Sequence, residues 1–252
     1  MKKIITIIAV LTLPLLLKAQ ESNDSLWVKA NNLYTSEEYQ KAIPVYEQIL
    51  ASGNESAKLY FNLGNAYYKA GEINKAILNY ERAKVLAPQD EDVEFNLRIA
   101  NQFVVTKIDE LPKPFFVRWK TSIVNKYPAD TWAVISIGSF VIFLFLLGLF
   151  FFSRNVAVRR FSFWISMALI VISVIAFSLA GKQKKKINTR DQAIVFCPRV
   201  TVKSSPSESG TDLFLIYEGL KIQVTDSLGS WTEIRLADGN QGWLRDSCIV
   251  KI

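Results

Sequence analysis

Two long apolar runs constrain the fold of this 252-residue chain more than any other feature. Residues 131–152 and residues 161–180 each lack Asp, Glu, Lys and Arg. At about 1.5 Å of rise per residue, a helix of either length crosses the roughly 30 Å hydrocarbon core of a bilayer. The short basic loop between them, residues 153–160, allows only an antiparallel turn. The runs therefore predict a two-helix transmembrane hairpin, and the alternative is a pair of buried helices in a water-soluble core.

The start of the chain predicts the side of the membrane on which the rest lies. Residues 1–20 combine a basic start, an apolar stretch and a small residue near the end, which is typical of a secretory signal peptide. An uncleaved anchor is the alternative, and both place the next segment outside the cytoplasm. Two spans then return the C-terminal segment to that side. The arginines of residues 153–160 agree with the positive-inside rule, whereas the basic linker, residues 181–190, does not.

A 34-residue period organises residues 23–105. A shift of 34 places Ala42 on Ala76 and Tyr46 on Tyr80. Paired helices with this period are typical of tetratricopeptide repeats, in which small residues allow close helix crossings and large ones fill the space between repeats. We predict two all-α repeats and a capping helix, and the alternative is an amphipathic bundle whose self-similarity is coincidental.

Residues 57–90 resemble the tetratricopeptide repeat (TPR) family, because they carry Leu63-Gly64, Tyr67, Ala76, Tyr80, Ala83 and Pro88 at the family positions. The resemblance implies a concave surface, lined by the first helix of each repeat, that binds a peptide or a partner helix. Aromatic rings would supply apolar contact and amides would bond to a backbone, unless several of these rings only fill the core. The candidate residues are Trp27, Asn31, Tyr34, Lys58, Phe61, Asn65, Tyr68, Phe95 and Ile99.

Residues 106–130 form a linker in which aromatic and aliphatic residues recur at helical spacing. Phe116, Trp119 and Ile123 are separated by three and four positions, with basic residues between them. This pattern favours a helix that lies in the lipid headgroup region, with its rings toward the acyl chains. The alternative is an amphipathic helix packed on the repeats.

Residues 191–252 change to strand-like periodicity, with five short apolar runs separated by Gly, Ser, Asp and Pro. The closing Gly242-Trp243-Leu244, with Trp231 before it, resembles bacterial SH3-like (SH3b) domains. The resemblance implies a small all-β barrel that binds wall peptides or proteins. Trp231 and Trp243 are candidate groove residues, unless both serve packing. Cys197 and Cys248 would lie near each other on the first and last strands, either as a disulfide in an oxidising compartment or as free thiols.

The composition excludes several classes of function. The chain has no histidine, so Ser-His-Asp and Cys-His catalysis and histidine-containing zinc sites are excluded. Its net charge of +7 is concentrated at the chain start and beside the apolar runs, so nucleic acid is not an expected partner. We predict no catalytic residue, no cofactor and no metal site. The uncharged spans indicate an anchor rather than an ion pathway.

The order of these parts along the chain resembles the aerotolerance-operon (Bat) proteins of the BatE type. The resemblance implies a component of a bacterial inner-membrane complex, with both soluble modules in the periplasm and a role in oxygen or envelope-stress tolerance. The predicted function is a non-catalytic scaffold that binds proteins, including other membrane components of the complex. The alternatives are a peptidoglycan-binding receptor and a regulatory subunit of a membrane enzyme or transporter.

Overall fold

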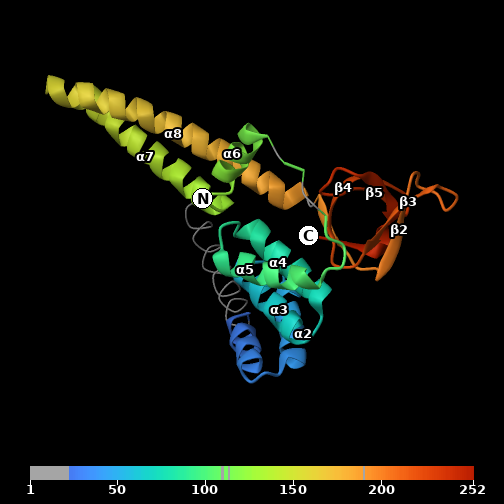
Figure 1. Ribbon diagram of the computed structural model, residues 1–252. Helices are drawn as coiled ribbons and strands as arrows, with labels where there is room; N and C mark the ends of the chain where they lie inside the picture. Colours follow the sequence, from blue (N-terminus) through green and yellow to red (C-terminus); the bar gives the residue numbers. More distant parts are fainter. Residues whose placement is uncertain (1–22, 109–110, 113, 190) are drawn as a thin grey trace, which may run out of the picture.

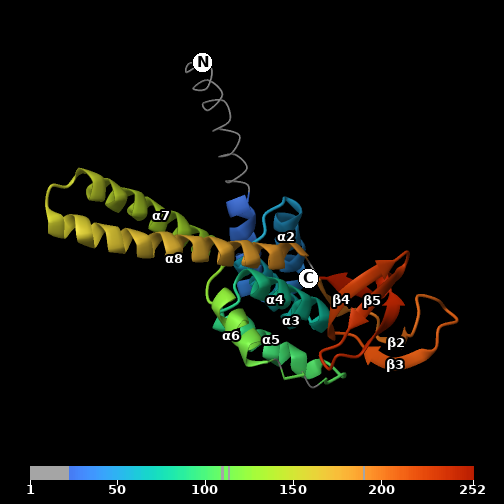
Figure 2. The ribbon, with the colours of Figure 1, turned by 90° about the horizontal axis from the view of Figure 1, so that it is seen from above.

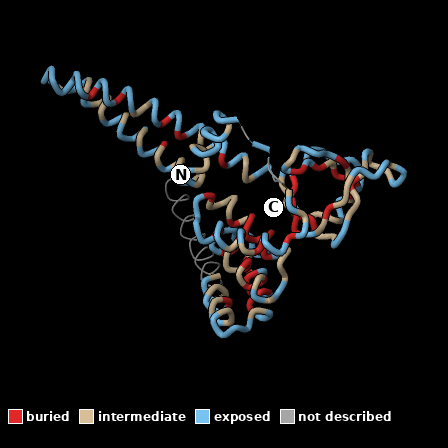
Figure 3. The backbone as a smooth tube through the Cα atoms, viewed as in Figure 1, coloured by how far each residue is buried: buried red, intermediate tan, exposed pale blue. Residues whose placement is uncertain are grey.

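The computed structural model describes residues 23–108, 111–112, 114–189 and 191–252. The predicted signal peptide, residues 1–20, lies outside the described residues. Helical repeats and an antiparallel sheet lie side by side, and a long helical hairpin extends away from them (Figures 1 and 2). The buried residues are concentrated in the repeats and the sheet, whereas the hairpin surface is largely exposed (Figure 3).

The N-terminal part consists of helices that follow one another in antiparallel pairs, as the 34-residue period predicts. Close packing requires Gly64, since a Cβ at that position would lie 2.7 Å from the buried ring of Tyr80. Ser56 accepts a hydrogen bond from the Leu59 amide at 3.1 Å and caps the first helix of the second repeat. The helices are residues 23–35, α2 (Tyr39–Ala51), α3 (Ala57–Lys69), α4 (Ile73–Leu86), α5 (Glu91–Ala100) and the short η1 (Asn101–Phe103).

The hairpin consists of α7 (Ala129–Phe152) and α8 (Val156–Thr189). Both helices are long and apolar enough to cross a membrane. Small residues join them: the Ser136 hydroxyl donates to the Ser173 carbonyl at 3.0 Å, and the Ser173 hydroxyl donates to the Ser136 carbonyl at 2.9 Å. Such reciprocal bonds satisfy both hydroxyls where water is scarce, and they allow the two backbones to approach closely.

The second helix of the hairpin is longer than the apolar run that predicts it. α8 continues through the basic segment that follows Ala180, because lysine and glutamine are good helix formers. Its last turns pack against α4, where Ile187 lies with Val85 and Leu86. Residues 181–189 of the predicted basic linker thus form a helical extension that brings the end of the hairpin to the repeats.

The C-terminal part is a single antiparallel sheet of seven strands in the order β3-β2-β6-β5-β4-β1-β7. The sheet is open, with β3 and β7 at its edges, so the predicted closed barrel is not confirmed. Two strands are additional to the five predicted, namely β3 and β7. The strands are β1 (Gln192–Val195), β2 (Arg199–Lys203), β3 (Asp212–Tyr217), β4 (Lys221–Leu228), β5 (Trp231–Arg235), β6 (Gln241–Arg245) and β7 (Ile249–Lys251), with η2 (Asp246–Cys248) before the last.

The sheet docks on the repeats through the turn between β3 and β4. Gly219 has a φ of +81°, and a Cβ there would lie 3.0 Å from both the Asn74 side chain and Val104. Next to it, Asn74 donates to the Glu218 carboxylate at 2.6 Å. The repeats and the sheet therefore share one continuous apolar core, which fixes their relative position.

A partly buried ion pair and two hydrogen bonds from backbone amides complete this junction. Lys221 lies 2.6 Å from Glu81, whose side chain is only 7% exposed. The amide of Tyr217 donates to the Thr106 hydroxyl at 3.2 Å. The amide of Leu111 donates to the Ala237 carbonyl at 3.1 Å, so the linker contacts the C-terminal module at this residue. The start of α7 and the end of α8 both lie near this junction. The repeats and the sheet are therefore at the same end of the hairpin, opposite the loop between α7 and α8 (Figure 1).

Candidate protein-binding groove

A single side-chain oxygen connects three consecutive helices in each repeat. In the first repeat, Asn31 Oδ1 accepts from the Tyr46 hydroxyl at 2.7 Å and from Asn62 Nδ2 at 3.0 Å. Asn31 lies on the first helix, Tyr46 on α2 and Asn62 on α3. The asparagine thus fixes the position of the next repeat relative to its own.

The same arrangement recurs 34 residues later. Asn65 Oδ1 accepts from the Tyr80 hydroxyl at 2.7 Å and from Asn96 Nδ2 at 2.8 Å. Burial raises the pKa of Tyr46 to about 12 and also raises the pKa of Tyr80, so both hydroxyls remain donors at neutral pH. Neither tyrosine was among the predicted binding residues. The 34-residue shift that relates them was the sequence signal for this role.

A pocket of about 170 Å³ lies between the first helix, α3, α4 and α5. Four of the nine predicted binding residues line it: Tyr34, Asn65, Tyr68 and Ile99. The remaining lining residues are Lys69, Tyr80 and Asn96. The pocket therefore combines aromatic walls with the side-chain amides of Asn65 and Asn96. The Asn96 nitrogen already donates to the Asn65 oxygen at 2.8 Å, so the Asn65 nitrogen and the Asn96 oxygen are the amide groups that remain for a ligand.

The other predicted binding residues lie outside this pocket. The ring of Trp27 packs against Tyr46 with centroids 6.0 Å apart, and the Lys58 ammonium lies 5.6 Å from the Trp27 ring. Phe61 packs on the buried ring of Tyr80 at 6.0 Å. Of this group, Phe95 is the most exposed aromatic, at 53%. Asn31, described above, belongs with them as a structural residue of the first repeat.

The two tryptophans predicted for a groove in the sheet lie on neighbouring strands, β5 and β6. Trp231 is 8% exposed, and the Arg245 guanidinium covers its ring at 4.5 Å. Arg245 is in turn held by an ion pair to Glu208 of the β2–β3 loop. Trp243 is half-buried and lies across from Glu233. The ring of Trp231 is thus packed beneath Arg245 rather than presented to solvent.

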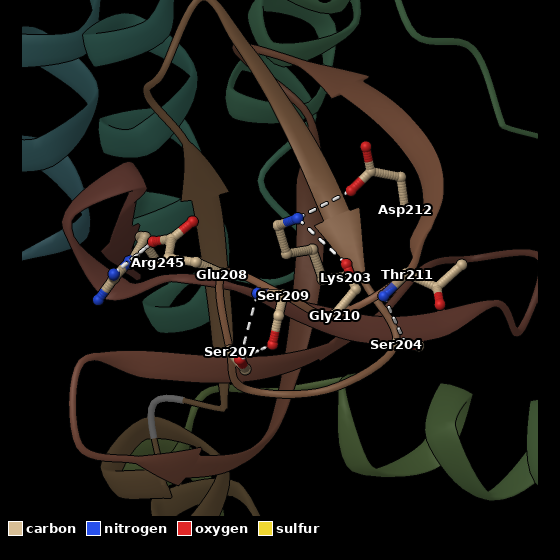
Figure 4. A network of polar contacts seen from close by, with 9 residues as sticks. All are labelled: Lys203, Ser204, Ser207, Glu208, Ser209, Gly210, Thr211, Asp212 and Arg245. Carbon is tan, nitrogen blue, oxygen red and sulfur yellow. Dashed lines mark hydrogen bonds and ion pairs between the residues drawn. The ribbon is translucent and has the colours of Figure 1, made fainter.

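Local hydrogen bonds hold the β2–β3 loop that supplies Glu208 (Figure 4). The Lys203 ammonium lies 2.9 Å from Asp212 and also donates to the Gly210 carbonyl at 3.2 Å. The Ser204 hydroxyl accepts from the Thr211 amide at 3.2 Å. The loop closes on itself, so it positions Glu208 for Arg245.

A disulfide joins Cys197 to Cys248 across 51 residues, with their Cα atoms 4.9 Å apart. Cys197 follows β1 and Cys248 precedes β7, and these two strands pair directly. Within the described ranges, no group of three or more His, Cys, Asp or Glu side chains is arranged to hold a metal ion.

Comparison with known proteins supports the assignment of the second repeat. The tetratricopeptide repeat family model matches residues 57–90, which span α3 and α4. Residues 57–90 form a TPR. The TPR family is a non-catalytic repeat family that mediates protein–protein interactions. A search of curated proteins finds no match for the chain.

Proposed function

We propose that this protein is a non-catalytic, membrane-anchored scaffold that binds a segment of a partner protein in the TPR groove. The observation that carries the proposal is the pocket lined by Tyr34, Asn65, Tyr68 and Ile99 at a recognised TPR. Aromatic walls with amide groups suit an extended peptide or the apolar face of a helix. The fixed junction between the repeats and the sheet supports a rigid platform rather than two independently moving modules.

The proposal also states where the protein is located in the cell. We infer that α7 and α8 span the bacterial inner membrane and that both soluble modules face the periplasm. The uncharged runs at residues 131–152 and 161–180 support the membrane placement. The Cys197–Cys248 disulfide supports the periplasmic side, because disulfides persist in oxidising compartments. The resemblance to the BatE-type proteins adds a role in an envelope complex for oxygen or envelope-stress tolerance.

Photocrosslinking in intact membranes tests the groove. With p-benzoylphenylalanine in place of Tyr68, we expect a specific adduct to one partner protein. The same group in place of Lys41, which is exposed on α2, is the matched control and should give no such adduct. Ile99→Glu should reduce the Tyr68 adduct by about tenfold or more, because it places a charge in the apolar part of the pocket.

The alternative that the SH3-like resemblance raises is peptidoglycan binding. A pull-down of the full chain on purified sacculi distinguishes the two functions. Strong retention on sacculi that Trp243→Ala abolishes, together with no adduct at Tyr68, would replace the scaffold proposal by a wall-binding one.

The helix α6 (Phe115–Val124) supports the membrane part of the proposal and gives a separate prediction. No residue of this helix is buried, and Phe115, Phe116 and Trp119 are 83%, 68% and 62% exposed. α6 packs against α8 (Figure 1). Exposed rings on a basic helix directly before a membrane span are typical of the lipid interface.

A spin label at position 119 is expected to lie among the acyl chains. The two native cysteines form a disulfide, so Trp119→Cys provides a unique labelling site in the full chain. Thr121→Cys lies on the opposite face of α6 and is the control. In nanodiscs, the label at 119 should be accessible to oxygen and protected from a water-soluble nickel complex, and the label at 121 should show the reverse. Equal access to the nickel complex at both positions would mean that α6 is not interfacial.

A further inference from the structure

A second cavity lies between the repeats and the sheet, apart from the TPR groove. Its volume is about 580 Å³, within the range of roughly 300–1,000 Å³ that holds small ligands or a few residues of peptide. One wall comes from α4 and α5, and the other comes from β4, β5 and the turn after β5. No residue of this cleft was among those predicted to bind a ligand, since the cleft exists only where the two modules meet.

The cleft carries an excess of positive charge. Among the described residues, four cationic side chains line it and two acidic ones, Glu81 and Glu94. Glu81 is already paired with Lys221 at 2.6 Å. Within the described part of the chain, the other three cations, Lys84, Arg98 and Arg235, have no carboxylate at ion-pair distance.

The partners of the two arginines are neutral. The Arg98 guanidinium lies 5.9 Å from the centre of the Phe95 ring. The Arg235 guanidinium donates to the side-chain oxygen of Gln241. Outside the lining, Lys186 of α8 adds a further positive charge, which interacts with Lys84 and Lys221 and with the carboxylates of Glu81 and Asp191. Because like charges gathered in one cleft repel each other, an anionic ligand would lower the electrostatic free energy of this site.

The rest of the lining indicates what kind of anion fits. The apolar surface that a ligand can reach in this cleft comes from Leu111, which is 57% exposed. The other large apolar residues of the lining, Leu97, Ile222 and Leu236, are buried. The side-chain amides of Gln192 and Gln223 also line the cleft and can bond to a peptide backbone. A small inorganic anion would leave the apolar surface unused. A chain in which acidic and apolar side chains alternate would use the charges, the amides and the apolar surface together.

We propose that this cleft binds an acidic peptide segment of a partner protein, whose carboxylates pair with Lys84, Arg98 and Arg235 while an apolar side chain contacts Leu111. This site is separate from the TPR groove and goes beyond the scaffold function proposed above. α4 contributes to the cleft, and Lys186 brings the end of the hairpin next to it, so an occupied cleft would join the repeats, the sheet and the hairpin.

Fluorescence anisotropy with the full chain in zwitterionic nanodiscs tests the proposal. The probe is a fluorescein-labelled peptide of alternating Glu and Leu, and the control peptide has Gln in place of every Glu. We expect saturable binding of the Glu peptide that weakens with added salt, and no saturable binding of the Gln peptide. Arg98→Glu should weaken binding by about tenfold or more, since a charge-assisted hydrogen bond is lost and a repulsive charge is added.

Matched variants separate the cleft from general charge effects and from misfolding. Arg199→Glu makes the same charge change at an exposed position of β2, outside the cleft, and should leave the affinity within about twofold of the wild type. Glu94→Gln should strengthen binding, which a folding defect would not do. Tyr68→Ala, in the TPR groove, should leave the affinity for this probe unchanged, so failure of the groove proposal and failure of this one are distinguishable.

Three results would overturn the inference. Equal affinity of the Arg98→Glu and Arg199→Glu proteins would mean that the peptide does not bind in this cleft. Equal binding of the Gln peptide would mean that carboxylates are not recognised. Complete displacement by inorganic phosphate, or by phosphatidylglycerol in the nanodisc, at charge concentrations equal to those of the peptide would assign the site to phosphate groups instead.

Discussion

Loss of the Cys197–Cys248 disulfide is expected to destabilise the sheet by about 4 kcal/mol. The bond closes a loop of 51 residues, which contains most of the sheet. In the chain-entropy model, opening a loop of this length gives the unfolded chain many more conformations, and the folded sheet gains nothing in return. β7, a three-residue edge strand whose sheet partner is β1, depends on this bond most directly.

Hydrogen exchange of the full chain measures the effect without requiring the modules to unfold together. In the Cys197→Ala, Cys248→Ala double variant, amides of β1 and β7 should exchange up to roughly a thousandfold faster, which corresponds to about 4 kcal/mol. Amides of α3 are the internal control and should change little. Wild-type protein treated with a reductant should match the double variant. Unchanged protection of β1 in both samples would show that the sheet does not depend on the bond.

The same pair of cysteines tests the proposed location in cells. If the C-terminal module faces an oxidising compartment, alkylation of intact cells followed by denaturation should find no free thiol on the wild-type chain. Two alkylated thiols in unreduced material would place residues 191–252 in the cytoplasm. That result would also contradict the predicted orientation of the hairpin, which places the sheet in the periplasm.

The helical repeats could be predicted because their signal is local and repeated. The 34-residue shift that relates Tyr46 to Tyr80 reflects an identical packing requirement in two places, and the structure shows the same hydrogen bonds at both. Two apolar runs likewise predicted two long helices. In each case a single segment of sequence carries the whole pattern, so no knowledge of distant contacts is needed.

The features that could not be predicted from the sequence depend on distant contacts or lie in short segments. β3 includes Leu213, Phe214 and Leu215 in a continuous apolar run, which has no strand periodicity, and β7 is too short to show any. The continuation of α8 past Ala180 was missed because hydropathy marks the end of an apolar run, not the end of a helix. In all three cases the deciding contacts come from other elements.

The two candidate sites also differ in whether a local sequence pattern predicts them or distant contacts create them. Four of the predicted binding residues line one pocket, because the repeat pattern places them on the same side of successive first helices, and their role in binding stays a prediction. The charged cleft was not predictable, because Arg98 and Arg235 lie far apart in sequence and meet only when the sheet docks on the repeats. Nothing local to the Glu218-Gly219 turn indicates that it contacts Asn74.

Substitution of the asparagine that connects three helices should have the second largest effect on stability. Asn65→Ala is expected to lower the free energy of unfolding of the repeats by about 3 kcal/mol. The variant removes one acceptor from two donors, the Tyr80 hydroxyl and the Asn96 amide. Tyr80 is only 1% exposed, so water cannot replace the lost bond without opening the core. The donor would therefore remain buried and unsatisfied.

Chemical denaturation of the full chain, followed by hydrogen exchange of amides in α3 and α4, measures this loss. Asn65→Asp keeps an acceptor oxygen at the same place and should cost less than Asn65→Ala, which separates the hydrogen bonds from side-chain volume. Asn32→Ala, at an exposed position on the first helix, is the matched control and should change stability by less than about 0.5 kcal/mol. Asn31→Ala should destabilise the repeats to a similar extent, because the Tyr46 hydroxyl and the Asn62 amide both lose their shared acceptor, the Asn31 oxygen. Equal stability of the Asn65→Ala and Asn32→Ala proteins would mean that the Tyr80 hydroxyl and the Asn96 amide find other acceptors. The hydrogen bonds to Asn65 would then not be what holds the short array together.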